Sequence, residues 1–139
     1  MRLARLFFLT ISAVFVLAAI AFMPQDLCFE SGGTYTFYCG TSSADCKVVT
    51  VQNFAKAQKL CHKNDCGEST DYENFDMESF LESVGGKVVF EEKFSDGVNY
   101  YCTADLPYSV ELYNHKINLH IAVKGNAARV ASPIIFGGY

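Results

Sequence analysis

Six cysteines and three histidines are the residues of this chain whose types could support thiol, redox or metal chemistry. Cys61, His62 and Cys66 form the densest group, and sulfur and imidazole ligands of this kind bind zinc. The gap between these two cysteines is wider than in the usual zinc pairs, and the two-residue gap of a thioredoxin-type motif is absent. We therefore predict no metal site and no cofactor. The candidates for structural disulfides are all six cysteines: Cys28, Cys39, Cys46, Cys61, Cys66 and Cys102.

An even number of cysteines in a small exported domain favours disulfides over other uses of the thiols. The sequence leaves the connectivity open. Local spacing favours a Cys39–Cys46 pair across a hairpin loop and a Cys61–Cys66 pair across a short polar turn, which would leave Cys28 to reach Cys102.

Cys102, His120 and Asp105 are the residues from which a cysteine nucleophile with a base could be assembled, because a thiol needs a neighbouring base to become reactive. Nothing in the sequence brings them together, and a surface or cross-strand histidine is far commoner than a catalytic one. The chain contains no Gly-x-Ser-x-Gly, His-Glu-x-x-His or phosphate-loop motif. We predict a protein that is not an enzyme. The alternative is a small exported thiol-dependent enzyme that uses Cys102 or the Cys61-His62-Cys66 cluster.

The first 23 residues have the three-part pattern of a secretory signal. Arg2 and Arg5 precede an uncharged apolar run over residues 6–23, and Ala19-Ile20-Ala21 provides a small-residue exit. We predict that residues 1–21 are a signal peptide. An uncleaved membrane anchor is the alternative, since a run of about 18 apolar residues is at the lower limit for spanning a bilayer. Both interpretations place the rest of the chain outside the cytosol, either secreted or anchored by residues 6–23.

Residues 22–139 are enough for one compact exported domain and too few for two. Without Arg2 and Arg5, nine basic residues oppose fifteen acidic ones, so this part has a formal net charge of −6. Nucleic-acid binding depends on clustered Lys and Arg. The charge therefore argues against a nucleic-acid partner.

Residues 22–85 form a cysteine-rich, polar part with few regular elements. The β-branched and aromatic runs at 34–39 and 47–51 predict strands. Apolar spacing of three and four residues predicts a short helix over 52–63. The stretch 64–74 is rich in Asp, Glu, Ser and Gly, which is typical of a loop. A second short helix is expected between Asp76, which can cap it, and Gly85-Gly86.

Residues 86–139 alternate with a period of two and predict a β-meander. Strands are expected over 87–94, 98–105, 109–112, 117–124 and 128–136, with an Asp96-Gly97 hairpin turn between the first two. His120 falls on the side of its strand opposite the apolar row of Ile117, Leu119 and Ile121. The predicted fold is α+β: an antiparallel sheet of four to five strands with two short helices packed on one face, plus the cysteine-rich N-terminal segment.

The C-terminal run Ile117-Asn118-Leu119-His120-Ile121-Ala122-Val123, followed by Ser132-Pro133-Ile134-Ile135-Phe136-Gly137-Gly138-Tyr139, resembles the end of the YwmB-like exported proteins. The resemblance covers about residues 88–139. It implies a TATA-box-binding-protein-like α+β fold with a curved antiparallel sheet, an extracytoplasmic location and no established biochemical activity. The fold name does not imply DNA binding.

These observations predict an exported, non-enzymatic domain of unknown biochemical activity that acts at the cell envelope, mainly by protein–protein contact. An envelope protein is the expected partner, and a membrane is contacted only through an uncleaved N-terminal segment. A disulfide-rich secreted factor is a further alternative.

Overall fold

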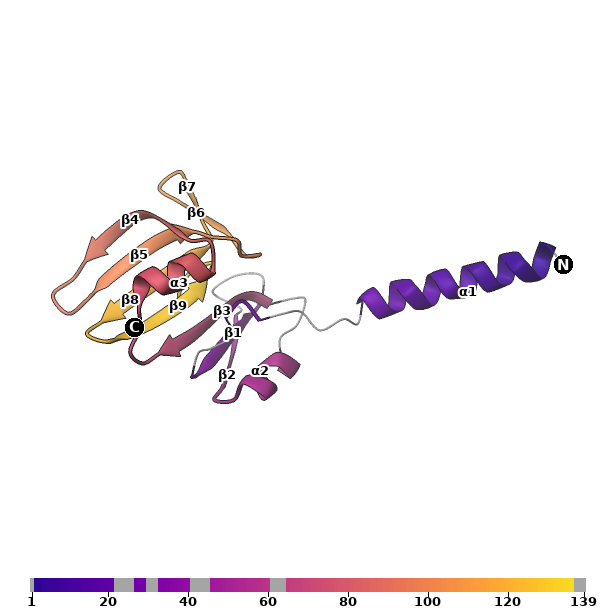
Figure 1. Ribbon diagram of the computed structural model, residues 1–139, viewed down its shortest axis with the longest axis horizontal. Coiled ribbons are helices and arrows are strands. Elements are labelled where there is room, and N and C mark those ends of the chain that lie inside the picture. The colour runs from indigo at the N-terminus through magenta and orange to yellow at the C-terminus, as the bar shows by residue number, and fades with distance from the viewer. Residues whose placement is uncertain (1, 22–26, 30–32, 41–45, 61–64, 137–139) are drawn as a thin grey trace.

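The protein has an α+β fold built on a seven-stranded antiparallel sheet, seen in a computed structural model that describes residues 2–21, 27–29, 33–40, 46–60 and 65–136 (Figure 1). The strand order in the sheet is β2-β1-β3-β9-β8-β5-β4, and β6 and β7 form a separate hairpin. The strands are β1 Tyr35–Cys39, β2 Lys47–Val51, β3 Asp65–Tyr72, β4 Lys87–Lys93, β5 Val98–Thr103, β6 Val110–Leu112, β7 His115–Ile117, β8 Leu119–Lys124 and β9 Ala127–Ser132. The helices are α1 Arg2–Ala21, α2 Phe54–Leu60 and α3 Met77–Ser83.

The α+β class and the antiparallel pairing are confirmed, but the predicted count of four to five strands is wrong. The segment interpreted as a loop over 64–74 contains β3, which pairs with β1 on one side and with β9 on the other. The prediction failed because the segment is polar, although Glu68, Ser69 and Thr70 are all buried in the folded strand. The cysteine-rich part is therefore not an appendage to the meander, because it supplies three strands of the same sheet.

The last strand is also shorter than the sequence indicated. β9 ends at Ser132 and is followed by a cis Ser132–Pro133 peptide bond, so residues 134–136 lie outside the sheet. Proline has no N–H to donate to a strand ladder, which accounts for the end of the pairing. Helix α3 begins where the sequence predicted. Asp76 caps it by accepting a hydrogen bond from the backbone N–H of Ser79 at 2.7 Å.

One face of the sheet, which we call the helix face, holds the core. Tyr35 pairs with Thr70, Thr70 with Val130, and Val130 with Ile121, so these side chains point to the same side. Both short helices pack there. Ala57 of α2 joins a cluster with Leu27, Tyr35 and Phe37, and α3 covers a second cluster with Met77, Phe80, Leu81 and Val84.

Residues 27–29 tie the N-terminal side of the domain to this core. Leu27 and Phe29 are buried, and the carboxylate of Glu68 accepts hydrogen bonds from the backbone N–H groups of Cys28 (3.1 Å) and Phe29 (3.3 Å). Glu68 itself is only 1% exposed. A single side chain on β3 thus holds the entry of the chain against the sheet.

Helix α1 lies apart from the sheet in Figure 1, with apolar side chains such as Phe15 and Leu17 exposed to solvent. Within the part of the chain that the structure describes, no helix meets the length and hydrophobicity of a membrane-spanning segment.

Replacing Glu68 with alanine should destabilise the domain by roughly 2–5 kcal/mol, because two backbone donors near the core would lose their acceptor. Urea unfolding of the full chain followed by circular dichroism measures this. Glu73→Ala is the matched control, since Glu73 is exposed on the turn just after β3. Equal midpoints for the two variants would contradict the role given to Glu68.

Candidate ligand-binding cavity

The face opposite the helices, which we call the open face, carries a row of polar and aromatic side chains. Strand register sets one row across it: Ser69 is opposite Ala131, Ala131 opposite His120, His120 opposite Tyr101, and Tyr101 opposite Phe90. His120 therefore lies on the side away from the apolar row, as the alternation of its strand predicted. Chemistry at His120 is separated from the core by the thickness of the sheet.

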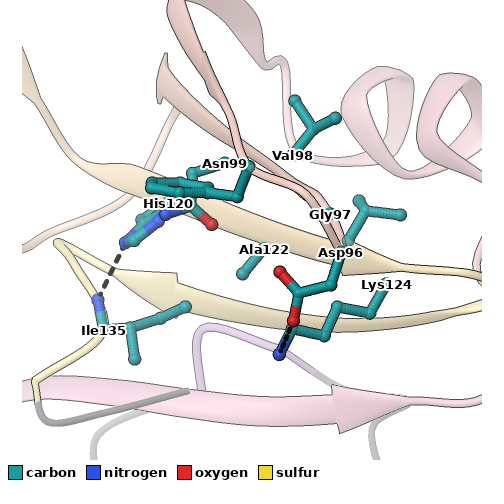
Figure 2. Close-up of a pocket in the computed structure, with 10 residues that line it drawn as sticks. Asp96, Gly97, Val98, Asn99, His120, Ala122, Lys124 and Ile135 are labelled. Carbon is teal, nitrogen blue, oxygen red and sulfur yellow. Dashed lines mark hydrogen bonds and ion pairs between the residues drawn. The ribbon is translucent and has the colours of Figure 1, made fainter.

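A cavity of about 310 Å³ opens on this face beside His120 (Figure 2). Its volume is at the lower end of the range of small-molecule sites. The β4–β5 turn, strand β8 and the segment after β9 contribute its walls. The residues that matter for its chemistry are Phe94, Asp96, Asn99, His120, Lys124 and Ile135.

The two charged residues of the cavity neutralise each other. Lys124 Nζ lies 2.8 Å from a carboxylate oxygen of Asp96. The hydrogen bond to Lys124 lowers the pKa of Asp96 below its ordinary value, so the carboxylate remains ionised and paired near neutral pH. The Lys124 and Asp96 side chains are 41% and 63% exposed, and the pair contributes little to stability. Its consequence is that the cavity has no net charge.

His120 supplies a neutral imidazole to the cavity wall. Its residue is 7% exposed, and Nδ1 accepts a hydrogen bond from the backbone N–H of Ile135 at 3.2 Å. Burial lowers the pKa of His120 to about 4. An imidazole that accepts at Nδ1 bears its proton on Nε2. This Nε2 is buried and has no hydrogen-bond partner among the described residues.

An aromatic row fixes the position of His120. Its ring stacks on Tyr101 with centroids 4.5 Å apart, and Tyr101 stacks on Phe90 at 4.4 Å. The Tyr101 hydroxyl donates to Glu92 at 3.0 Å, and desolvation followed by this contact raises the pKa of Tyr101. The facing surfaces of these rings are used in stacking on one another. The row therefore acts as a rigid wall for His120 and not as an open stacking platform.

The segment after β9 closes the remaining side. Phe136 packs on Tyr38 with ring centroids 4.9 Å apart, and Gly67 lies beneath it. A Cβ at Gly67 would stand 3.0 Å from both the Phe136 ring and the Ser132 carbonyl oxygen. The absence of a side chain at position 67 thus allows the tail to cross the sheet and place Ile135 over His120.

The structure does not bring the imagined Cys102–His120–Asp105 group together. Cys102 is opposite Leu119, so it faces the core while His120 faces outward. Cys102 is fully buried, and desolvation raises the pKa of its thiol to about 12. Asp105 lies elsewhere, at the end of α3, where its backbone N–H donates to the carbonyl oxygen of Val84.

The other cysteines are spread over the N-terminal part. Cys28 packs against the cluster that contains Cys102, and Cys39 packs against the cluster that contains Phe37. Cys46 and Cys102 are free thiols in this structure. Cys66 lies on β3, whereas Cys61 and His62 lie outside the described residues. Within the described ranges no three His, Cys, Asp or Glu side chains are grouped so as to hold a metal ion. The disulfide set stays a prediction.

Sequence reasoning identified His120 and the Asp96-Gly97 turn but did not connect them. Asn99 and Lys124 carried a detectable signal, because both fall on the polar side of alternating strands. The sequence contained no signal for Ile135, since its position depends on how residues 133–136 pack against the sheet.

No protein-family model matches this chain, and comparison with curated proteins and with solved structures likewise gives no match.

The buried imidazole predicts a specific pH dependence of stability. Between an unfolded pKa near 6.5 and the folded value of about 4, the unfolded chain binds a proton that the folded chain does not. Stability should therefore fall as the pH drops through this window, by up to about 1.4 kcal/mol per pH unit from this group. His120→Gln should flatten the curve relative to the unsubstituted protein.

Urea midpoints measured from pH 7 to pH 4 check this, with the exposed His115 replaced in the control variant His115→Gln. If His120→Gln and the unsubstituted protein lose stability in parallel between pH 7 and pH 4, the assignment of His120 as a buried neutral imidazole is wrong.

Proposed function

We propose that this chain is an exported, non-enzymatic domain that acts at the cell envelope by binding a protein partner through its open face. The observation that carries the proposal is the cavity beside His120, which is outside the core, uncharged overall and lined by both donors and acceptors. Asn99 can donate and accept, Asp96 accepts and Lys124 donates. Such a set fits an uncharged polar segment of a protein better than an anionic or cationic ligand.

Two observations support the location. The apolar run of residues 6–23 follows two arginines, and the described side chains of α1 are exposed and make no core with the sheet. The resemblance of residues 88–139 to the YwmB-like exported proteins also supports an extracytoplasmic location. Whether α1 is removed or anchors the domain decides if the open face works free in solution or close to a membrane.

The rival function, a thiol-dependent enzyme, has little physical support at Cys102. Thiol chemistry requires an accessible thiolate with a nearby base. A fully buried thiol with a pKa of about 12, on the opposite face from His120, meets neither condition.

Alkylation tests the enzymatic alternative at Cys102. In the folded full chain near pH 8, the thiolate fraction at Cys102 is on the order of one in 10⁴ at a pKa of about 12, so iodoacetamide should leave it unmodified. Cys46 is the internal comparison, because it is partly exposed and free. Mass spectrometry after denaturation, with and without reductant, then separates a buried thiol from a disulfide. Labelling of folded Cys102 as fast as Cys46 would favour the enzyme.

Site-specific photo-crosslinking tests binding at the open face. Benzoylphenylalanine in place of Phe94, which is 56% exposed on the cavity wall, should give a defined protein adduct in the envelope of the producing cell. The same group in place of Val88, which is 44% exposed and outside the cavity, should give none.

Ala122→Leu in the Phe94-substituted protein tests whether the adduct depends on the cavity. Ala122 lines the cavity, and a larger side chain there would occupy it. The adduct should weaken several-fold while the thermal unfolding transition is retained, and Asn99→Ala replaces this variant if its fold is lost. Identical adducts from positions 94 and 88, or an adduct insensitive to these variants, would remove the cavity from the proposal.

A further inference from the structure

The two edges of the seven-stranded sheet differ in how they are protected. β4, at one edge, has a register shift between Val88 and Phe90 and carries four charged residues in its sequence Lys-Val-Val-Phe-Glu-Glu-Lys. Bulges and charges of this kind block pairing with further strands. β2, at the other edge, pairs with β1 in continuous register over its whole length and contains only one charge, at Lys47.

β2 is also open to solvent. Val48 is 57% exposed, and Lys47 and Thr50 are exposed as well. Among the described strands β1 is its only partner, so one row of its backbone N–H and C=O groups faces outward. Its sequence Lys-Val-Val-Thr-Val is rich in β-branched residues, which favour extended pairing. An edge strand with one charge and no register shift is a template for another strand.

We propose that β2 pairs antiparallel with β2 of a second copy of this chain, around a two-fold axis at Val49. This interface lies at the edge of the sheet that is farthest in strand order from the cavity and is independent of the proposed function. A two-fold axis is the commonest symmetry of soluble homo-oligomers.

A second copy fits this edge because the strand is self-complementary in that register. Lys47 would lie opposite Val51 of the other copy, and Val48 opposite Thr50, so no like charges meet. Val49 and Val51 are opposite Phe37 and Tyr35 of β1, on the helix face. The two-fold pairing therefore joins the helix faces of both copies into one continuous surface, with four valines at the junction.

Sedimentation velocity of the full chain in a non-ionic detergent, over a range of concentrations, tests the pairing. We expect a reversible dimer with a dissociation constant on the order of 100 µM, because one strand pair buries less than a standard interface. Val48→Lys should weaken it by about tenfold or more. Val88→Lys, the matched substitution on the other edge, should change it less than about twofold.

The register itself is tested by charge exchange. In the double variant Val48→Lys with Thr50→Glu, each lysine faces a glutamate of the other copy, so dimerisation should return to within about threefold of the original. A chain that stays monomeric at every concentration overturns the proposal. So does equal weakening by Val48→Lys and Val88→Lys, or a dimer insensitive to both, which would attribute association to another part of the chain such as α1.

Discussion

The pairing of β3 with both β1 and β9 is the constraint on which the rest of the structure depends. Without β3 the large sheet would consist of two separate groups of strands, β2-β1 and β9-β8-β5-β4. β3 holds this position although five of its eight residues are polar or charged. Backbone hydrogen bonds to two neighbours supply the pairing. Of the buried polar side chains, Glu68 and Ser69 have hydrogen-bond partners, whereas the Thr70 hydroxyl has none among the described residues.

Three polar side chains of β3 each connect a different part of the molecule. Glu68 holds residues 28 and 29, and the Ser69 hydroxyl lies 3.3 Å from the Tyr38 hydroxyl on β1. Asp71 forms two hydrogen bonds with Arg129 on β9, at 2.6 and 3.0 Å. A carboxylate held by both arms of a guanidinium fixes orientation as well as charge. The polar side chains of β3 therefore hold it to residues 28 and 29, to β1 and to β9.

Much of the fold could be predicted from the sequence where the period of two was clear. β4, β5 and β8, the Asp-Gly turn, the cap at Asp76 and the outward position of His120 all followed from local patterns. β3 could not be predicted in this way, because its alternation is between polar residues and its burial arises only from contacts made across the sheet. The same limit applies to the cavity, for which the sequence indicated single side chains without indicating that residues 96, 120 and 135 would meet.

The chemistry of the cavity depends on the tail more than on the strands that form its floor. Strand alternation places His120 on the open face, but it does not determine which ring nitrogen carries the proton. The backbone N–H of Ile135 occupies Nδ1 and thereby assigns the proton to Nε2. Burial by the same segment and by the Tyr101 ring lowers the pKa of His120, so the imidazole in the cavity wall carries no charge and its Nε2–H is buried. Since Gly67 is what allows the tail to cross β3, a position on the far side of β9 from His120 contributes to the hydrogen-bonding character of the cavity. A residue of the cysteine-rich part, Gly67, thus helps to form the cavity that the β-meander lines with His120 and Ile135.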